Sequence, residues 1–173
     1  MKKTGVRFRL LSFLAATAVG AFVMTNTAEA QASPVAGKLG LGIATAFSPG
    51  PGPDTGLNLV FDGGMWHADA IAALSGNGAS TASLGAHGWF HVREGAMSDF
   101  SVGGGLGWFR YNPEGPGEGA SGVGIDIGFM IRAFVTANVA VGATGGLQVL
   151  SGDFDGFSLS GQPVGAFSFT YFF

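Results

Sequence analysis

Large apolar residues and very small residues alternate with period two over much of this chain. The clearest stretch is VGIDIGFMIR, residues 123–132, in which valine, isoleucine or phenylalanine occupies every other position. Successive side chains of a β-strand point to opposite faces, so this pattern predicts a strand with one bulky apolar face. Glycine accounts for 32 of the 173 residues and disfavours helices. The chain is therefore predicted to be all-β.

The alternation recurs in eight segments of about nine to eleven residues, the length that a tilted strand needs to cross a bilayer. The segments are 38–47, 55–62, 66–74, 83–92, 100–108, 123–132, 139–149 and a last one from near Pro163 to the C-terminus. Long loops rich in glycine, proline or acidic residues (48–54, 75–81, 112–121 and 151–158) alternate with tighter turns (63–64, 93–98 and 134–138). This layout predicts an eight-stranded antiparallel up-and-down β-barrel with both termini on the side of the turns.

The composition of the two strand faces indicates which face points outward. Charged residues make up 11% of the chain, whereas an ordinary soluble domain has about 25%. A soluble secreted barrel is the alternative, but it would have to present the glycine-rich face to water. The lumen of an eight-stranded barrel is only wide enough for side chains, so small residues fit the interior, and Gly40→Ser is expected to be mild. We therefore predict a transmembrane barrel whose large residues face lipid.

Aromatic residues on the bulky face lie near the expected membrane interfaces and are candidates for the aromatic girdles of such a barrel. These residues are Phe47 and Trp108 on the loop side, and Phe61, Trp66, Phe90, Phe100, Tyr171 and Phe173 on the turn side.

The N-terminus predicts export. Four basic residues within the first nine precede the apolar run 10–24, and Ala28-Glu29-Ala30 then supplies the small residues that a signal peptidase accepts. The run is shorter than the roughly 20 residues of a spanning helix. We predict a signal peptide at 1–30, a short N-terminal segment at 31–37 and the barrel at 38–173.

Charge and cysteine content exclude other classes of protein. Residues 31–173 contain four basic and ten acidic residues, a net charge of −6, so a basic surface for nucleic acid is not expected. The chain has no cysteine and therefore forms no disulfide.

The C-terminal sequence FSFTYFF places Phe167, Phe169, Tyr171 and Phe173 on one strand face. With this ending and the layout of residues 38–173, the chain resembles the small eight-stranded outer-membrane barrels of Gram-negative bacteria, the family of the OmpA membrane domain and OmpX. The resemblance implies that the four aromatics form the signal read by the barrel-assembly machinery. It also implies a monomer in the outer membrane, in contact with lipid and lipopolysaccharide.

Several ionisable residues are predicted to point into the lumen. Asp62, His67, Asp69, His91 and Arg132 should lie in its turn-side half, with His87 and Asp126 further toward the loops and Trp89 and Met130 filling the space between them. Two imidazoles and two carboxylates are a plausible ligand set for a metal or a proton site. A salt-bridged plug is favoured instead, because an unpaired charge is costly in a confined interior and no motif spacing indicates convergence. Such a plug argues against an open pore, which needs about 16 strands.

Acidic residues also gather in the predicted loops. A rim of these carboxylates is a candidate site for divalent cations that bridge to anionic head groups, although solvated loop charge is the favoured interpretation. The residues are Asp54, Glu114, Glu118, Asp153 and Asp155.

The favoured function is that of a non-enzymatic barrel with an envelope-structural or surface-interaction role. No catalytic residue, cofactor or metal is predicted. A lipid-modifying barrel enzyme is one alternative, but it needs a histidine paired with serine and a carboxylate near the outer leaflet, and the sequence does not place one there. A barrel that binds a small apolar ligand in its lumen is the other.

Overall fold

A computed structural model describes residues 33–45, 55–153, 156–160 and 166–173, all within the unit Gln31–Phe173. The predicted signal peptide at 1–30, the loop at 48–54, and Phe47 and Pro163 lie outside the described residues. No helix in the described part of the chain is long and apolar enough to cross a membrane.

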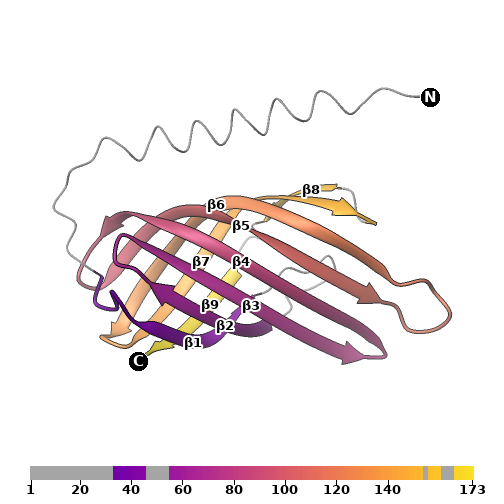
Figure 1. The fold of residues 1–173 in the computed structure, drawn as a ribbon, viewed down its shortest axis with the longest axis horizontal. Coiled ribbons are helices and arrows are strands. Elements are labelled where there is room, and N and C mark those ends of the chain that lie inside the picture. The colour runs from indigo at the N-terminus through magenta and orange to yellow at the C-terminus, as the bar shows by residue number, and fades with distance from the viewer. Residues whose placement is uncertain (1–32, 46–54, 154–155, 161–165) are drawn as a thin grey trace, which may run out of the picture. The chain divides into compact units, whose positions relative to one another are not determined.

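The described residues form nine antiparallel strands that close into a barrel (Figure 1). The strands are β1 (Leu39–Thr45), β2 (Thr55–Asp62), β3 (Trp66–Asn77), β4 (Ala79–Glu94), β5 (Ser98–Asn112), β6 (Ala120–Thr136), β7 (Val139–Gly152), β8 (Gly156–Ser160) and β9 (Ala166–Phe172). Each strand pairs with its neighbour in sequence up to β7, and β9 pairs with both β7 and β1. Because β8 and β9 pair with successive halves of β7, they are two segments of one barrel strand. The fold is therefore an eight-stranded up-and-down barrel, as predicted.

Strand ends at the loop side differ from the prediction. The expected loop at 75–81 is wrong, because β3 and β4 continue to a tight turn at Gly78, whose positive φ of 86° suits glycine. The expected loop at 151–158 is longer than the connection in the structure, because β7 runs to Gly152 and β8 starts at Gly156. The loop between β5 and β6 is confirmed, but it is shorter than the predicted 112–121.

The turn side has the three predicted turns, although those predicted at 93–98 and 134–138 are shorter in the structure. Short turns join β2 to β3, β4 to β5 and β6 to β7 at the end of the barrel where the chain finishes (Figure 1). Gly64, in the first of these turns, has a positive φ of 92°.

The bulky strand face points outward. Ile125, Ile127 and Phe129 of β6 are 63%, 42% and 44% exposed. Glycines and alanines lie between the large residues of the strands. Some of them face the interior, and others fill gaps between large side chains on the outer surface. Monomeric soluble proteins rarely expose an apolar patch of this extent. The described girdle aromatics are exposed as well: Phe61, Trp66, Phe90, Phe100, Trp108, Tyr171 and Phe173.

The barrel interior is filled by side chains. Its apolar part includes Val60, Trp89, Phe109 and Met130, all buried. The expectation that Gly40→Ser is mild is wrong, because a Cβ atom at Gly40 would lie 2.6 Å from Thr170 Cγ2 and 2.9 Å from Phe172 Cδ1. Phe172 is itself fully buried and has little room to move. Glycine on the inner face thus makes room for large neighbours.

Candidate functional site

The ionisable residues predicted to point inward do so. Asp62 ends β2, His67 and Asp69 lie on β3, His91 on β4 and Arg132 on β6. All except His91 are buried on the inner face, and His91 is nearly so. The structure brings four of them into one cluster, whereas Asp69 belongs to a second one.

Arg132 is the centre of the first group, which we call the arginine cluster: Asp62, His67, His91, Glu94, Asp99 and Arg132. Its Nη2 donates to Asp62 Oδ2 and to Asp99 Oδ2, both at 2.7 Å, while its Nε donates to Asp99 Oδ2 at 2.9 Å. Arg132 and both aspartates are at most 3% exposed. Two-pronged hydrogen bonds between a guanidinium and a carboxylate are among the strongest that side chains form.

The two histidines of the arginine cluster form a chain of hydrogen bonds. Arg132 Nη2 lies 3.0 Å from His91 Nε2, and His91 Nδ1 faces Glu94. His67 Nδ1 lies 2.7 Å from His91 Nε2. His67 Nε2 donates to Met130 Sδ at 3.3 Å, because a thioether sulfur can only accept, and His67 Nδ1 is therefore assigned as the acceptor of the hydrogen bond from His91 Nε2.

A second group, which we call the upper cluster, lies closer to the loop side: Asp69, His87, Trp89 and Asp126. His87 Nδ1 is 2.7 Å from Asp69 Oδ1, and His87 Nε2 is 3.2 Å from Asp126 Oδ2. Trp89 Nε1 donates to Asp69 Oδ2 at 2.8 Å. Because both nitrogens of the His87 ring face carboxylates, the ring bridges β3 and β6 through the lumen.

Sequence reasoning missed Glu94 and Asp99. Both lie beside the turn between β4 and β5. A turn was predicted at 93–98, whereas β4 continues to Glu94 and β5 already begins at Ser98. Period two extended from Ser101 would have placed Asp99 on the inner face.

Three members of the arginine cluster have the chemistry of a metal site. Potential ligand atoms of Asp62, His67 and His91 all lie within 4.8 Å of one another, and imidazole with carboxylate suits a divalent transition metal. However, Arg132 Nη2 already hydrogen-bonds to Asp62 and lies 3.0 Å from His91 Nε2. A guanidinium therefore supplies the positive charge at this point, and a metal would have to displace it.

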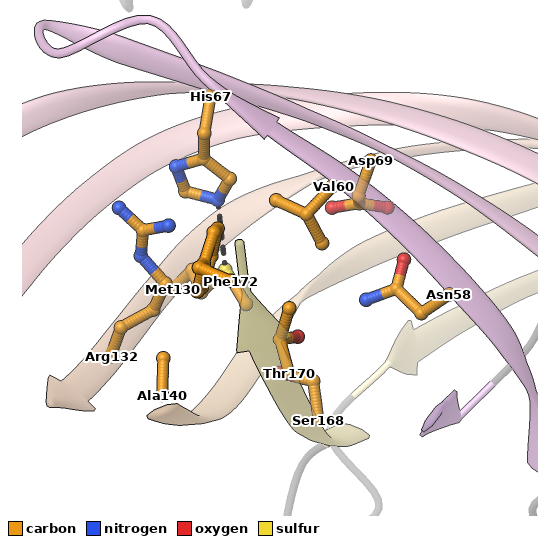
Figure 2. Close-up of a pocket in the computed structure, with 10 residues that line it drawn as sticks. All are labelled: Asn58, Val60, His67, Asp69, Met130, Arg132, Ala140, Ser168, Thr170 and Phe172. Carbon is orange, nitrogen blue, oxygen red and sulfur yellow. Dashed lines mark hydrogen bonds between the residues drawn. The ribbon is translucent and has the colours of Figure 1, made fainter. Parts of the chain in front are cut away.

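Beside the arginine cluster lies a cavity of about 10 Å³, close to the smallest volume that holds one water molecule (Figure 2). Asn58 and Arg132 both line it, and the Asn58 Oδ1 and Arg132 Nη1 atoms have no hydrogen-bond partner among the described residues. An acceptor and a donor at so small a space suit water much better than an organic ligand. Further lining residues are Val60, His67, Asp69, Met130, Ala140, Ser168, Thr170 and Phe172.

Trp89→Phe tests the hydrogen bonding of the upper cluster. It removes the donor to Asp69, and a buried carboxylate that loses a hydrogen bond typically costs about 1 to 3 kcal/mol. We expect a loss of that size in the free energy of unfolding, measured by urea titration with gel mobility as the readout.

The matched control for this prediction is Trp108→Phe, which changes an outward-facing tryptophan of β5. Its effect should be about 0.5 kcal/mol or less, as for other surface positions. Equal losses in the two variants would show that the Trp89–Asp69 hydrogen bond contributes nothing specific.

The other predicted sites lie at the two ends of the barrel. Phe167, Phe169 and Tyr171 are about half exposed on the outer face of β9, and Phe173 follows them at the C-terminus. Of the acidic loop residues, Asp153 accepts a hydrogen bond from the Ser121 backbone at 2.8 Å, and Glu114 and Glu118 are exposed. Asp54 and Asp155 lie outside the described residues.

Comparisons with known proteins give one structural likeness. No family model and no curated protein matches the chain. The chain is similar to the crystal structure of Ail, the attachment invasion locus protein of Yersinia pestis. The two are 18% identical, with a TM-score of 0.43, and the likeness covers 79% of this chain and 97% of that one.

Proposed function

We propose that this protein is an outer-membrane barrel of Gram-negative bacteria with an envelope-structural or surface-interaction role and no enzymatic activity. The observation that carries the proposal is the division of side chains between the two faces of the barrel. Most large apolar residues of β1 to β7 and β9 point outward, whereas the charged residues in the middle of the strands point inward and pair with one another. A lipid bilayer is the environment that stabilises an apolar outer face of this kind.

A plugged lumen is the second part of the proposal. The arginine cluster and the upper cluster link β2, β3, β4, β5 and β6 across the interior, and the cavity beside them is about the size of one water molecule. Side chains held by such networks do not leave room for hydrated ions. We therefore expect the barrel to contribute to the envelope as a closed body.

The engagement of the histidines supports a non-enzymatic role. A lipid-modifying barrel enzyme needs an imidazole that activates a serine at the outer leaflet. Here the ring nitrogens of His67, His87 and His91 face carboxylates, Arg132, Met130 or one another, inside the lumen. Their arrangement is that of a structural network.

The proposal includes a route to the membrane. The signal peptide at 1–30 would be removed after export, and Phe167, Phe169, Tyr171 and Phe173 would be read by the barrel-assembly machinery. The folded barrel would then remain a monomer in contact with lipid and lipopolysaccharide, with no nucleic-acid partner.

Cell fractionation with heat-modifiable gel mobility tests class and location together. We expect the protein in the outer-membrane fraction, with unboiled protein migrating as a compact barrel and boiled protein at its full mass. Purified barrel in a planar bilayer should show no steady conductance. A soluble periplasmic protein would contradict the membrane assignment, and a stable open channel would contradict the plugged lumen. A change in lipid A upon overexpression would favour the enzyme instead.

A further inference from the structure

The residues just before β1 turn back into the end of the barrel. Within Ser33–Lys38, the backbone N–H of Ala36 donates to Ser33 O and that of Lys38 donates to Val35 O, both at 3.0 Å, which makes a tight turn. Gly37 has a positive φ of 77°, and its N–H donates to Asp62 O at 2.7 Å. The segment is thus fixed to the end of β2, on the turn side.

Val35 is the apolar anchor of this segment. Its side chain is 0% exposed and belongs to a buried cluster with Val60 of β2, Phe134 of β6, Ala140 of β7 and Phe172 of β9. These four strands lie on both sides of the junction where the last strand meets the first. Val35 thus packs against inward-facing side chains at the place where the last strand pairs with the first.

The same segment covers the arginine cluster. Ser33 is 5% exposed, and its Oγ lies 3.5 Å from Asp62 Oδ2, which itself accepts a hydrogen bond from Arg132. Asp62 is 0% exposed although it is the last residue of its strand. A charged side chain at the end of a strand is normally exposed to solvent. The complete burial of Asp62 therefore requires residues outside the strands to shield it.

We propose that Ser33–Lys38 is a lid that closes the turn-side mouth of the lumen, with Val35 as its anchor. The inference rests on the closed barrel and deepens the plugged lumen of the proposed function by naming what seals this end. The lid is short and is held by one buried apolar side chain and a few backbone hydrogen bonds. Such a segment opens locally without unfolding of the strands beneath it. Lys38 is its fixed end, because Lys38 Nζ donates to Ala137 O at 3.1 Å across the β6–β7 turn.

Thiol accessibility tests the lid, because the natural chain has no cysteine. Ala140→Cys places one thiol beneath Val35, on a residue that is 3% exposed. The refolded barrel in detergent micelles would be treated with a charged methanethiosulfonate reagent, and the labelling rate would be measured by mass spectrometry. Adding Val35→Asp should displace the lid and raise the rate at least tenfold. Val35→Ala, which removes only packing, should raise it by a smaller factor.

Two controls make the result specific. Ala36→Asp places the same charge on the adjacent, exposed residue and should leave the labelling of Ala140→Cys unchanged. A thiol at Ala96, exposed in the β4–β5 turn, should react rapidly in every variant. Unchanged protection of Ala140→Cys in both Val35 variants would overturn the lid, and so would rapid labelling with the native lid.

Gel mobility of each variant separates these outcomes from failure of the barrel. Folded, heat-modifiable protein with an unprotected thiol overturns the lid alone and leaves the barrel intact. If Val35→Asp prevents folding, Val35→Ala decides the question. Protein that never shows barrel mobility contradicts the proposed function instead.

Discussion

Ile127→Arg is expected to reduce the stability of the inserted barrel by about 2 to 4 kcal/mol, because it places a charge on the lipid-facing surface near the middle of the membrane. Ile127 lies next to the midpoint of β6, and its side chain is 42% exposed on the outer face. A guanidinium there loses its hydration unless it bends the surrounding lipid or reaches an interface. Urea titration of protein folded into vesicles, read by gel mobility, measures the loss.

The control is Val135→Arg, which places the same charge on the same face of the same strand, one residue before β6 ends. Val135 is 63% exposed and should lie at the turn-side interface, where arginine costs about 0 to 1 kcal/mol. A soluble barrel would tolerate both substitutions, since water would hydrate either arginine. Equal, small effects would therefore overturn the membrane assignment, while the depth dependence would support it.

The positions of the strands and the direction of their faces could be predicted from the same pattern, the placement of bulky apolar residues at every second position. A strand that crosses a membrane must offer lipid a bulky apolar residue at every second position, and the sequence of β6 follows that pattern, which indicates both the strand and its inner face. Beyond the bilayer the demand ceases. Residues 75–81 are small and polar, and 151–158 add two phenylalanines to such residues. These compositions suit a solvated strand as well as a loop, and here most of the residues lie in strands.

The polar clusters were predictable where period two holds and not where it breaks. Asp62, His67, Asp69, His91 and Arg132 face inward as the alternation requires. A register shift lies between His91 and Arg93, so the residues after it exchange faces. Glu94 consequently points inward and meets His91, which strict alternation from His91 would not allow.

The lid had no signal in the sequence. Ser33–Lys38 is too short for any periodicity, and its single anchor, Val35, is an apolar residue in an otherwise unremarkable stretch. Only the three-dimensional closure of the barrel brings Phe134, Ala140 and Phe172 to one place beneath it. Contacts between segments so far apart in the chain are a property of topology, which local patterns do not encode.

Arg132→Met should cost about 3 to 5 kcal/mol of unfolding free energy, the largest effect expected of any lumen substitution. Methionine retains much of the length of the side chain but leaves Asp62 and Asp99 buried without a counter-charge. The penalty arises from those two carboxylates and not from the lost attraction itself. Adding Asp62→Asn and Asp99→Asn should therefore recover at least half of the loss, since neutral amides are cheaper to bury.

Arg110→Met is the matched control, because Arg110 is exposed at the loop-side end of β5 and its Nε donates to Asn112 Oδ1 at 3.2 Å. An exposed arginine of this kind contributes about 0.5 kcal/mol or less. Similar losses for Arg132→Met and Arg110→Met would contradict the buried cluster. If the triple variant, which combines Arg132→Met with Asp62→Asn and Asp99→Asn, is no more stable than Arg132→Met alone, the loss arises from packing. Removing the two carboxylate charges would then not have raised the free energy of unfolding. Recovery in the triple variant would instead show that Arg132 serves to neutralise carboxylates that the closed barrel holds away from water.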